Sequence, residues 1–150
     1  MGVLSDTHGL LRDEARDALA NCSLILHAGD IGDPGVLQEL EDMAPVVAVR
    51  GNTDMSSWSQ HLSHTELVEF QGFSFYILHD LFELDLDPQA AKINAVISGH
   101  THRPLVEERN GVLFLNPGSA GPRRGSLPIC LARIQVMEGQ LQPEIFELVS

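Results

Sequence analysis

The sequence predicts an α/β fold in which two sheets pack face to face and helices cover each of them. The first half of the chain alternates short apolar runs with helix-like segments, a pattern typical of parallel strands joined by right-handed crossovers. The second half carries two-residue hairpin signals, which indicate antiparallel strands. The chain has 150 residues, the size of one ordinary domain, so we expect a single domain over residues 1–150.

Five short apolar runs, each followed by turn-forming residues, are predicted to be buried strands. In chain order they are Val3-Leu4, Leu24-Ile25-Leu26, Val46 to Val49, Phe73 to Leu78, and Ala95-Val96-Ile97. Helices are predicted between the first three runs, over Arg12 to Leu19 and Pro34 to Met43, and a proline suits the first turn of the second. A third short helix is expected to begin at Asp87-Pro88, where the aspartate can cap it.

Two turns shape the second half of the chain. The segment Arg109-Asn110-Gly111-Val112 is a strong hairpin signal, and Glu138-Gly139 separates two further alternating runs. We therefore expect antiparallel strand pairs on either side of each turn.

Composition and charge exclude several classes of protein. With 9 Lys+Arg against 21 Asp+Glu the net charge is −12, so no basic surface for a long nucleic acid is expected. No stretch approaches the roughly 20 apolar residues that span a bilayer, and the first apolar run meets Asp6 too early for a signal peptide. We therefore expect a cytoplasmic protein without membrane contact. Cys22 and Cys130 lie among apolar residues and form no CxxC motif, so buried free thiols are expected.

Side chains with oxygen or imidazole ligands follow each of the five predicted strands. They are Asp6, His8, Asp30, Asn52, His79, His100 and His102. Because the carboxyl ends of parallel strands form the crevice where α/β sheets bind ligands, we expect these side chains to gather there. Taken singly, each has an ordinary structural explanation as a turn former or a structural histidine. The pairs Asp6/His8 and His100/His102 favour a metal site, because alternate residues of an extended chain point the same way.

The number of donors favours two metals over one. Seven mixed oxygen and nitrogen donors exceed the roughly four protein ligands of a tetrahedral zinc, and two cations about 3.5–4 Å apart would use them better. Asp30 is the natural bridge, because its two carboxylate oxygens can each face a different cation. Two divalent cations against Asp6 and Asp30 leave local positive charge, so this acidic protein would gain an anion site.

The ordered motifs resemble those of the calcineurin-like metallophosphoesterases. They are Ser5-Asp6-Thr7-His8-Gly9, Gly29-Asp30, Gly51-Asn52-Thr53-Asp54, His79 and Gly99-His100-Thr101-His102. With Asn116-Pro117-Gly118-Ser119 added, the similarity covers nearly the whole chain and is strongest to the small single-domain phosphodiesterases of the YfcE type. The resemblance implies a four-layer αββα sandwich of two mixed sheets, the metallophosphoesterase fold. It also implies a dinuclear centre, manganese first and nickel, iron or zinc as alternatives, that hydrolyses phosphoric esters.

The resemblance also assigns roles to residues. Asp6, His8, Asp30 and His102 would hold the first metal, and Asp30, Asn52, His79 and His100 the second. Asp30 and Asn52 would be catalytic, with a hydroxide between the metals attacking phosphorus in line. Asn52, Thr53 and Arg123 are the expected substrate-binding residues. Asp54 would fix neighbouring ligands by hydrogen bonds.

Three departures from the family pattern bear on this hypothesis. Many larger relatives have a histidine after the Gly-Asn pair that is thought to protonate the leaving group, whereas Thr53 cannot act as an acid near neutral pH. Relatives of the small type often show His-Gly-His after the strand that corresponds to Phe73 to Leu78, but here only His79 is kept, so the second metal is open to different ligation. The chain begins four residues before Ser5, which leaves the completeness of the first strand open.

Several other residues keep a structural and a functional interpretation. His27 is expected to be buried support for the site and not a ligand. His61 and His64 fit a surface turn, a substrate rim or a subunit contact. Arg123 and Arg124 either reach substrate phosphate or belong to a solvated loop. Asn116 either supports the site or forms a turn.

The expected function is a dinuclear metal-dependent phosphodiesterase acting on small phosphoric diesters, with phosphomonoesterase activity at the same site as the alternative. A second alternative is a non-catalytic scaffold like the retromer subunit of this fold, which has lost parts of the ligand set that this chain retains. A third, a metal-storage or sensing protein, explains the ligands but not the exposed site that Asn52 implies, and ranks last. A homodimer is expected at the level of the family.

Overall fold

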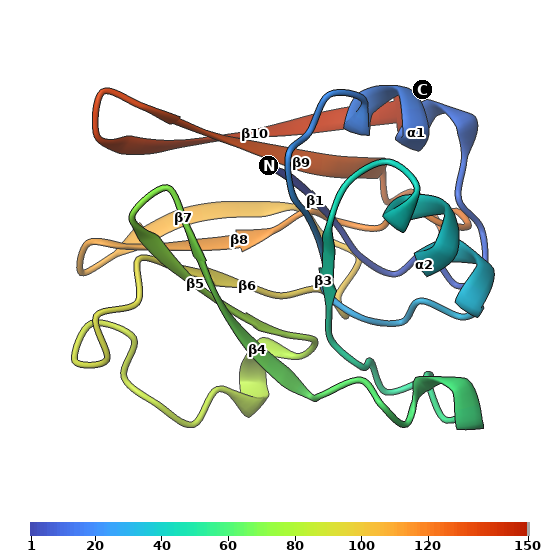
Figure 1. Ribbon diagram of the computed structural model, residues 1–150, viewed down its shortest axis with the longest axis horizontal. Coiled ribbons are helices and arrows are strands. Elements are labelled where there is room, and N and C mark those ends of the chain that lie inside the picture. The colour runs from blue at the N-terminus through green and yellow to red at the C-terminus, as the bar shows by residue number, and fades with distance from the viewer. Residues whose placement is uncertain (150) are drawn as a thin grey trace.

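Two five-stranded mixed sheets pack face to face (Figure 1), in a computed structural model that describes residues 1–149. The first sheet contains, in spatial order, β10 (Gln140–Val149), β9 (Ile129–Met137), β1 (Gly2–Leu4), β2 (Ile25–His27) and β3 (Val46–Ala48). The second contains β4 (Thr65–Phe70), β5 (Phe73–Leu78), β6 (Ala95–Ile97), β8 (Val112–Asn116) and β7 (Leu105–Arg109). The pairs β1–β2, β2–β3, β5–β6 and β6–β8 are parallel, and the others are antiparallel. The α/β class, the two mixed sheets and all five predicted strands are confirmed.

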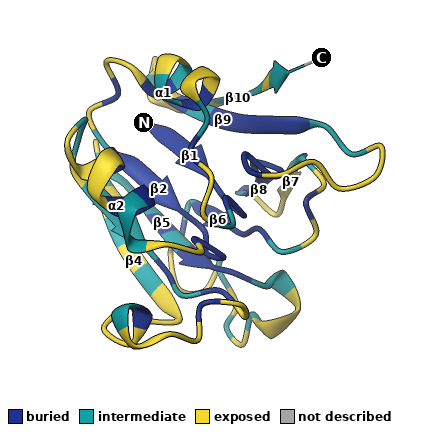
Figure 2. Ribbon diagram, turned by 90° about the vertical axis from the view of Figure 1, so that its right-hand side faces the viewer, coloured by how far each residue is buried: buried dark blue, intermediate teal, exposed yellow. Residues whose placement is uncertain are grey.

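Because side chains alternate in direction along the strands, the first sheet has a hydrophobic core on each of its two faces. Val3 and Leu26 pack with Phe75 into the core between the sheets. Their neighbours Leu4 and Ile25 point to the other face, where α1 (Asp13–Leu19) and α2 (Pro34–Glu41) cover them. Figure 2 shows strands β1 and β2 fully buried and β9 buried in its first half, residues 129–132, while the outward faces of the helices are exposed. Both predicted helices are thereby confirmed.

The start of α2 follows the predicted chemistry. The Asp33 carboxylate accepts a hydrogen bond of 2.7 Å from the Gly35 amide, and Pro34 occupies the first helical position, where its missing N–H is no loss. This arrangement fixes where the chain leaves the loop after β2.

The outer face of the second sheet is covered differently from the prediction. Leu78, Val96 and Phe114 form a small core there under the short 3-10 helix η2 (Leu81–Glu83) and a single turn over residues 88–92. The prediction of a helix beginning at Asp87-Pro88 is right about the cap and wrong about the length. The Asp87 carboxylate accepts from the Gln89 and Ala90 amides, but Lys92 has φ +60° and ends the turn.

All three hairpins turn through a pair of residues with positive φ. Asn110-Gly111 joins β7 to β8 with φ of 51° and 77°, and Glu138-Gly139 joins β9 to β10 with 54° and 74°, as predicted. The sequence analysis missed the third hairpin, in which Gln71-Gly72 joins β4 to β5. Strand β4 alternates exposed and half-buried residues and has no continuous apolar run to mark it.

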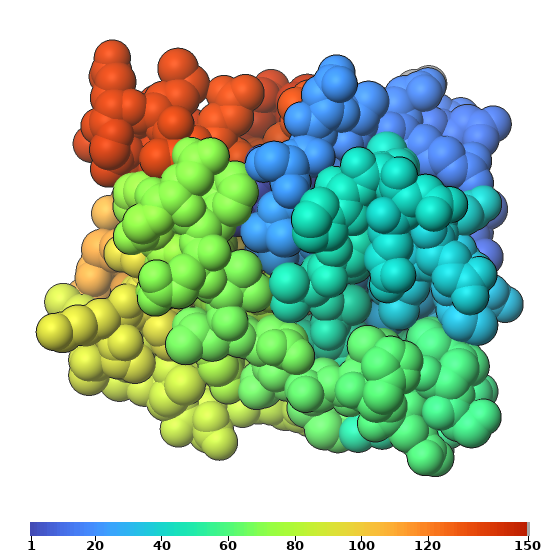
Figure 3. Space-filling view, in the orientation of Figure 1, coloured from blue at the N-terminus to red at the C-terminus, as the bar shows by residue number. Residues whose placement is uncertain are grey.

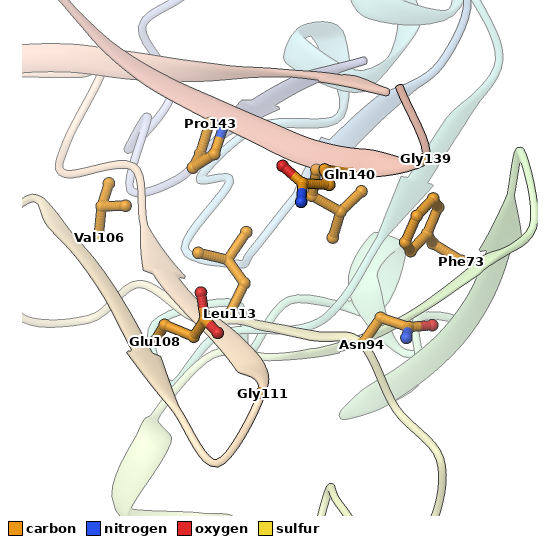
Figure 4. Close-up of a pocket in the computed structure, with 10 residues that line it drawn as sticks. Phe73, Asn94, Val106, Glu108, Gly111, Leu113, Gly139, Gln140 and Pro143 are labelled. Carbon is orange, nitrogen blue, oxygen red and sulfur yellow. The ribbon is translucent and has the colours of Figure 1, made fainter. Parts of the chain in front are cut away.

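The two sheets contact each other along one side of the sandwich and leave a cavity between them at the end where these hairpins turn. Strands β3 and β4 contact each other along one side of the sandwich, and Figure 3 shows the β4 surface beside that of α2. At the hairpin end a cavity of about 380 Å³ lies between the two sheets. Figure 4 shows Val106, Leu113 and Pro143 around it, with Phe73 and Asn94 from the starts of β5 and β6.

The two cysteines are free and buried, as predicted, and burial raises the pKa of the Cys130 thiol to about 11. Among the described residues, no helix is long and apolar enough to cross a bilayer.

Candidate metal centre

Parallel strands bring the seven predicted ligands to one end of the sandwich. Asp6 and His8 follow β1, and Asp30 and Asn52 follow β2 and β3. His79, His100 and His102 follow β5 and β6 of the second sheet. Contacts join the two sheets here, because His79 Nε2 lies 3.3 Å from Asp30 Oδ2 and His102 Nε2 lies 3.4 Å from Asp6 Oδ1. The expected crevice is therefore built from both sheets.

Five of the seven residues form two overlapping clusters with the geometry of metal ligands. One cluster is Asp6, His8 and His102, and the other is Asp6, Asp30 and His79; within each, the ligand atoms lie within 4.8 Å of one another. Asp6 belongs to both clusters. Asp30 also reaches toward both, since its Oδ2 lies 3.8 Å from His8 Nε2 as well as 3.3 Å from His79 Nε2.

Asn52 and His100 lie together beside the second cluster. His100 Nδ1 is 3.1 Å from Asn52 Oδ1, and the His79 and His100 rings meet edge to face with their centres 5.2 Å apart. The other ring nitrogen of His100 lies 3.9 Å from Asp80 Oδ2. Asp80 occupies the position at which the family resemblance leads one to expect glycine, so it brings a carboxylate to this ligand.

Unpartnered buried polar atoms show that these side chains fit a cation. Within residues 1–149, five buried side-chain nitrogen or oxygen atoms have no hydrogen-bond partner: Asp6 Oδ1, His8 Nε2, His79 Nε2, His102 Nδ1 and Arg50 Nε. Four of the five belong to the predicted ligands. Each such atom costs roughly 1–3 kcal/mol when left unpaired. A divalent cation bound by carboxylate oxygen and imidazole nitrogen would remove this cost, which makes the donor set suitable for a metal.

The ligands occupy strained backbone. Asp6, His8, Asp30, His100 and His102 all have φ between 46° and 73°, a left-handed conformation that non-glycine residues rarely adopt. Hydrogen bonds hold two of these carboxylates in place. Asp6 Oδ2 accepts from the Ser5 hydroxyl at 2.7 Å and from the His100 amide at 3.1 Å, and Asp30 Oδ1 accepts from the Thr53 amide at 2.9 Å.

Asp54 and Asn116 tie the ligand-bearing loops to one another. The buried Asp54 carboxylate accepts from the amides of Ile31, Gly32 and Gly51 at 3.0–3.1 Å, joining the loop after β2 to the loop after β3. The Asn116 amide donates to the Gly99 carbonyl and to Thr101 Oγ1, on either side of His100. Asn116 is therefore support for the His100–His102 loop, one of the two roles left open by the sequence.

His27 is buried support, as predicted. Its Nδ1 accepts from the Gly29 amide at 3.1 Å, and its Nε2 lies 3.0 Å from Thr7 Oγ1, whose own proton goes to the Ile31 carbonyl. The neutral ring with its proton on Nε2 satisfies both contacts. Burial, followed by the charge of His79, lowers the pKa of His27 to about 3.

The charges of Asp30 and His79 depend on each other. Burial alone would raise the pKa of Asp30, but the nearby His79 imidazole and the hydrogen bond from the Thr53 amide outweigh it and hold this pKa well below its usual value. Burial would lower the pKa of His79, but the Asp30 and Asp6 carboxylates raise it. His79 Nδ1 lies 2.7 Å from the Ala28 carbonyl, to which it donates. Its Nε2 is thereby left to face the carboxylates.

The predicted substrate-binding residues occupy different settings. Thr53 is exposed to solvent, and the hydrogen bond from its amide to Asp30 places it beside the ligands. The Arg123 guanidinium donates to the Leu127 and Val149 carbonyls. Burial lowers the pKa of His102 against the opposing effect of Asp6, and the Arg124 charge lowers it further.

Two residues near the site were missed or left undecided by the sequence analysis. His61 and His64 are exposed, and His64 lines a cavity of about 230 Å³ beside Asn52 and His100. Arg50 lines the same cavity and was not singled out at all. Its place directly before the Gly-Asn motif was the available signal.

Residues 1–139 match the calcineurin-like phosphoesterase superfamily domain. A probable metallophosphoesterase of Methanocaldococcus jannaschii is 36% identical over 134 residues, covering 79% of this chain and 67% of that protein. A phosphodiesterase of the same organism is 29% identical over 137 residues, covering 79% of this chain and 82% of that protein. The phosphodiesterase YfcE of Escherichia coli is 32% identical over 101 residues, covering 62% of this chain and 54% of YfcE.

Solved structures agree with the fold. The structure of an archaeal phosphodiesterase superposes with a TM-score of 0.77 at 25% identity, covering 97% of this chain and 98% of the other. Vacuolar protein sorting 29 of Cryptosporidium parvum superposes with a TM-score of 0.73 at 19% identity, covering 99% and 97%, a likeness of fold alone.

Proposed function

This chain belongs to the calcineurin-like phosphoesterase superfamily, and we propose that it hydrolyses small phosphoric diesters at a centre of two divalent cations. The observation that carries the proposal is the set of unpartnered buried donors on Asp6, His8, His79 and His102. A scaffold with no metal would have no reason to keep these atoms buried and unpaired. Residues 1–150 would act as one domain in the cytoplasm.

The ligands divide as the family resemblance implies. Asp6, His8, Asp30 and His102 would hold one cation, and Asp30, Asn52, His79 and His100 the other. When bound, the cations would supply a hydroxide nucleophile for in-line attack on phosphorus and would offset the charge on the phosphate oxygens. Manganese is the first candidate because the family resemblance implies it, and nickel, iron and zinc are the alternatives that a mixed set of carboxylate, amide and imidazole donors also suits.

Neighbouring side chains would position the ligands and the substrate. Asp54 holds the loops on which Asp30 and Asn52 are carried, and Asn116 holds the loop that carries His100. The Asn52 oxygen would face the cation, which leaves its NH₂ to donate to a phosphate oxygen. The Thr53 hydroxyl is too weak an acid to protonate a leaving group near neutral pH, so diesters with good leaving groups would react best.

Metal reconstitution tests the proposal. Metal-stripped protein is titrated with manganese while hydrolysis of a chromogenic diester and of its monoester is followed. We expect diester turnover to rise to a plateau near two metals per chain, because both cations are needed. Faster monoester turnover would assign a phosphomonoesterase instead. No turnover of either ester by folded protein with two bound metals would favour a non-catalytic scaffold of the vacuolar protein sorting 29 kind.

A further inference from the structure

Arg50 carries the one unpartnered buried polar atom, among those of the described residues, that a metal cannot explain. Its Nε is buried without an acceptor, like the four atoms on the ligand side chains. A guanidinium has only donors and stays protonated, so it cannot bind a cation. Unpaired positive charge beside a metal centre is instead suited to an anion.

The surroundings hold Arg50 at the edge of the metal centre. It directly precedes Gly51-Asn52, and its amide donates to the Ser63 carbonyl at 2.9 Å. Its side chain lines the cavity of about 230 Å³ that Asn52, His79 and His100 also line. A ligand bound to phosphate-binding metals would therefore extend toward Arg50 by way of this cavity.

His64 orients the guanidinium. Arg50 Nη2 lies 2.8 Å from His64 Nε2, and since arginine can only donate, Nε2 must be the acceptor. This contact requires the neutral imidazole with its proton on Nδ1. His64 is thereby a positioning residue for Arg50, and the contact disfavours a role as an imidazolium acid for the leaving group.

No carboxylate neutralises Arg50, although the chain has 21 acidic and only 9 basic residues. Within residues 1–149, no ion pair of 4.0 Å or less includes it, while Arg16 and Arg109 both form such pairs. Two acidic residues line the same cavity. Asp80 accepts from the Phe82 amide and turns its other oxygen toward His100, and Glu83 is exposed to solvent.

We propose that Arg50, oriented by His64, binds a second anionic group of the substrate. The inference rests on the proposed phosphodiesterase activity and names a substrate class, namely diesters with a carboxylate or phosphate on one short arm. Arginine matches such groups by donating two parallel hydrogen bonds. The cavity is smaller than the roughly 300–1,000 Å³ typical of sites for drug-sized ligands, which favours a short arm.

Binding of unreactive phosphonates to the manganese-loaded protein tests the inference without turnover. Calorimetry compares methyl-, ethyl- and propylphosphonate with phosphonoacetate, 3-phosphonopropionate and 4-phosphonobutyrate. We expect at least one carboxylated member to bind roughly 10- to 100-fold tighter than the alkylphosphonate that lacks the carboxylate. In Arg50→Gln this gain should fall to within about twofold, while affinity for the alkylphosphonates is unchanged.

Further variants keep the test decisive. Glu83→Gln should strengthen binding of the carboxylated probe, because it removes a like charge from the cavity. Arg109→Gln, at the hairpin end, is the matched control and should leave the gain intact. Should Arg50→Gln fail to fold, His64→Leu at an exposed position removes the orienting acceptor and should reduce the gain.

Two results would overturn the inference: no gain for any carboxylated probe, or a gain that survives Arg50→Gln. Both are separate from failure of the proposed function. Protein that shows the Arg50-dependent gain but hydrolyses no diester keeps the anion site and loses the proposed activity. Protein that hydrolyses diesters without the gain keeps the activity and loses the anion site.

Discussion

The two ends of the strands use the same unusual backbone conformation for different purposes. At the hairpin end, positive φ occurs in turn pairs such as Asn110-Gly111, where it lets two strands reverse direction. At the opposite end, positive φ occurs at Asp6, Asp30 and His100, where it directs ligand side chains into a shared centre. At the ligand end this conformation costs about 1–3 kcal/mol per residue, at positions where chemistry is expected.

Cavity size does not separate the two ends, but polar chemistry does. The hairpin end has the larger of the two cavities, about 380 Å³ against about 230 Å³, and polar side chains such as Glu108 line it together with apolar ones such as Leu113. Each unpartnered buried polar atom of the described residues lies at the ligand end, on a predicted ligand or on Arg50. Buried side-chain atoms without a hydrogen-bond partner are therefore a better guide than cavity size to the functional site in this molecule.

The Asp30 carboxylate reaches both ligand clusters, so its replacement should lower turnover far more than the matched change at the hairpin end. We expect Asp30→Asn to lower diester turnover at least about 1,000-fold, equivalent to roughly 4 kcal/mol, because both cations lose a charged ligand. Metal analysis of the purified variant should show fewer than two manganese ions per chain. Glu108→Gln makes the same chemical change at the hairpin cavity and should alter neither quantity. Wild-type turnover by Asp30→Asn would remove Asp30 from the centre.

Burial of a neutral histidine gives the ligand end a dependence on pH. The pKa of His27 is about 3 in the folded protein against 6.5 when exposed, so below about pH 6.5 the unfolded chain binds a proton that the folded protein does not. The free energy of unfolding should therefore fall by roughly 3 kcal/mol between about pH 7 and about pH 4 from this group alone.

Urea unfolding of metal-free protein measures this slope against that of His27→Gln. The raised pKa of His79 acts in the opposite direction, since it stabilises the folded protein below the unfolded pKa, and it is present in both proteins. The difference between the two slopes therefore isolates His27. Equal slopes would show that the ring is already protonated in the folded state.

Much of the fold followed from local patterns. Continuous apolar runs marked β1, β2, β3, β5 and β6, and the Asn110-Gly111 and Glu138-Gly139 pairs marked two hairpins. The pattern failed at β4, whose alternating residues lie at the edge of a sheet. It also failed to predict the length of the helical turn that begins at Asp87-Pro88. Lys92 adopts a left-handed backbone conformation that ends the turn, and residues at the start of a helix carry no signal for this.

The candidate site was predictable as far as its ligands were concerned, since each follows a strand that the sequence marks. The supporting contacts were less accessible, because they join residues far apart in the chain. Asn116 reaches the Gly99 carbonyl, and Arg50 meets His64 only because the loop before β4 folds back on the loop after β3. Such contacts depend on tertiary packing and leave no local signal.

One asparagine at each end supports its surroundings by hydrogen bonds, and replacing each by alanine should give smaller effects that can be compared directly. Asn116→Ala should weaken manganese binding roughly 10- to 100-fold, because it frees the loop that carries His100 and His102. Asn94→Ala removes an acceptor for the Ser74 amide at the hairpin cavity and should lower stability by about 1 kcal/mol without changing manganese affinity. Calorimetric titration and thermal unfolding of both variants provide the comparison. Equal manganese affinities would mean that the loop is held by other contacts.

Gly111→Ala should have the smallest effect on catalysis and is the most direct test of how separate the two ends are. A Cβ at this position meets no atom within 4 Å, so the cost is the left-handed backbone alone, roughly 1–2 kcal/mol. Unfolding should register that loss while diester kcat/KM stays at the wild-type value. Strand β8 runs from this hairpin directly to Asn116, so strain in the turn has a covalent route to the ligand loop. A fall in kcat/KM would show that strand β8 transmits the strain to the ligand loop, and the two ends would then not be independent of each other.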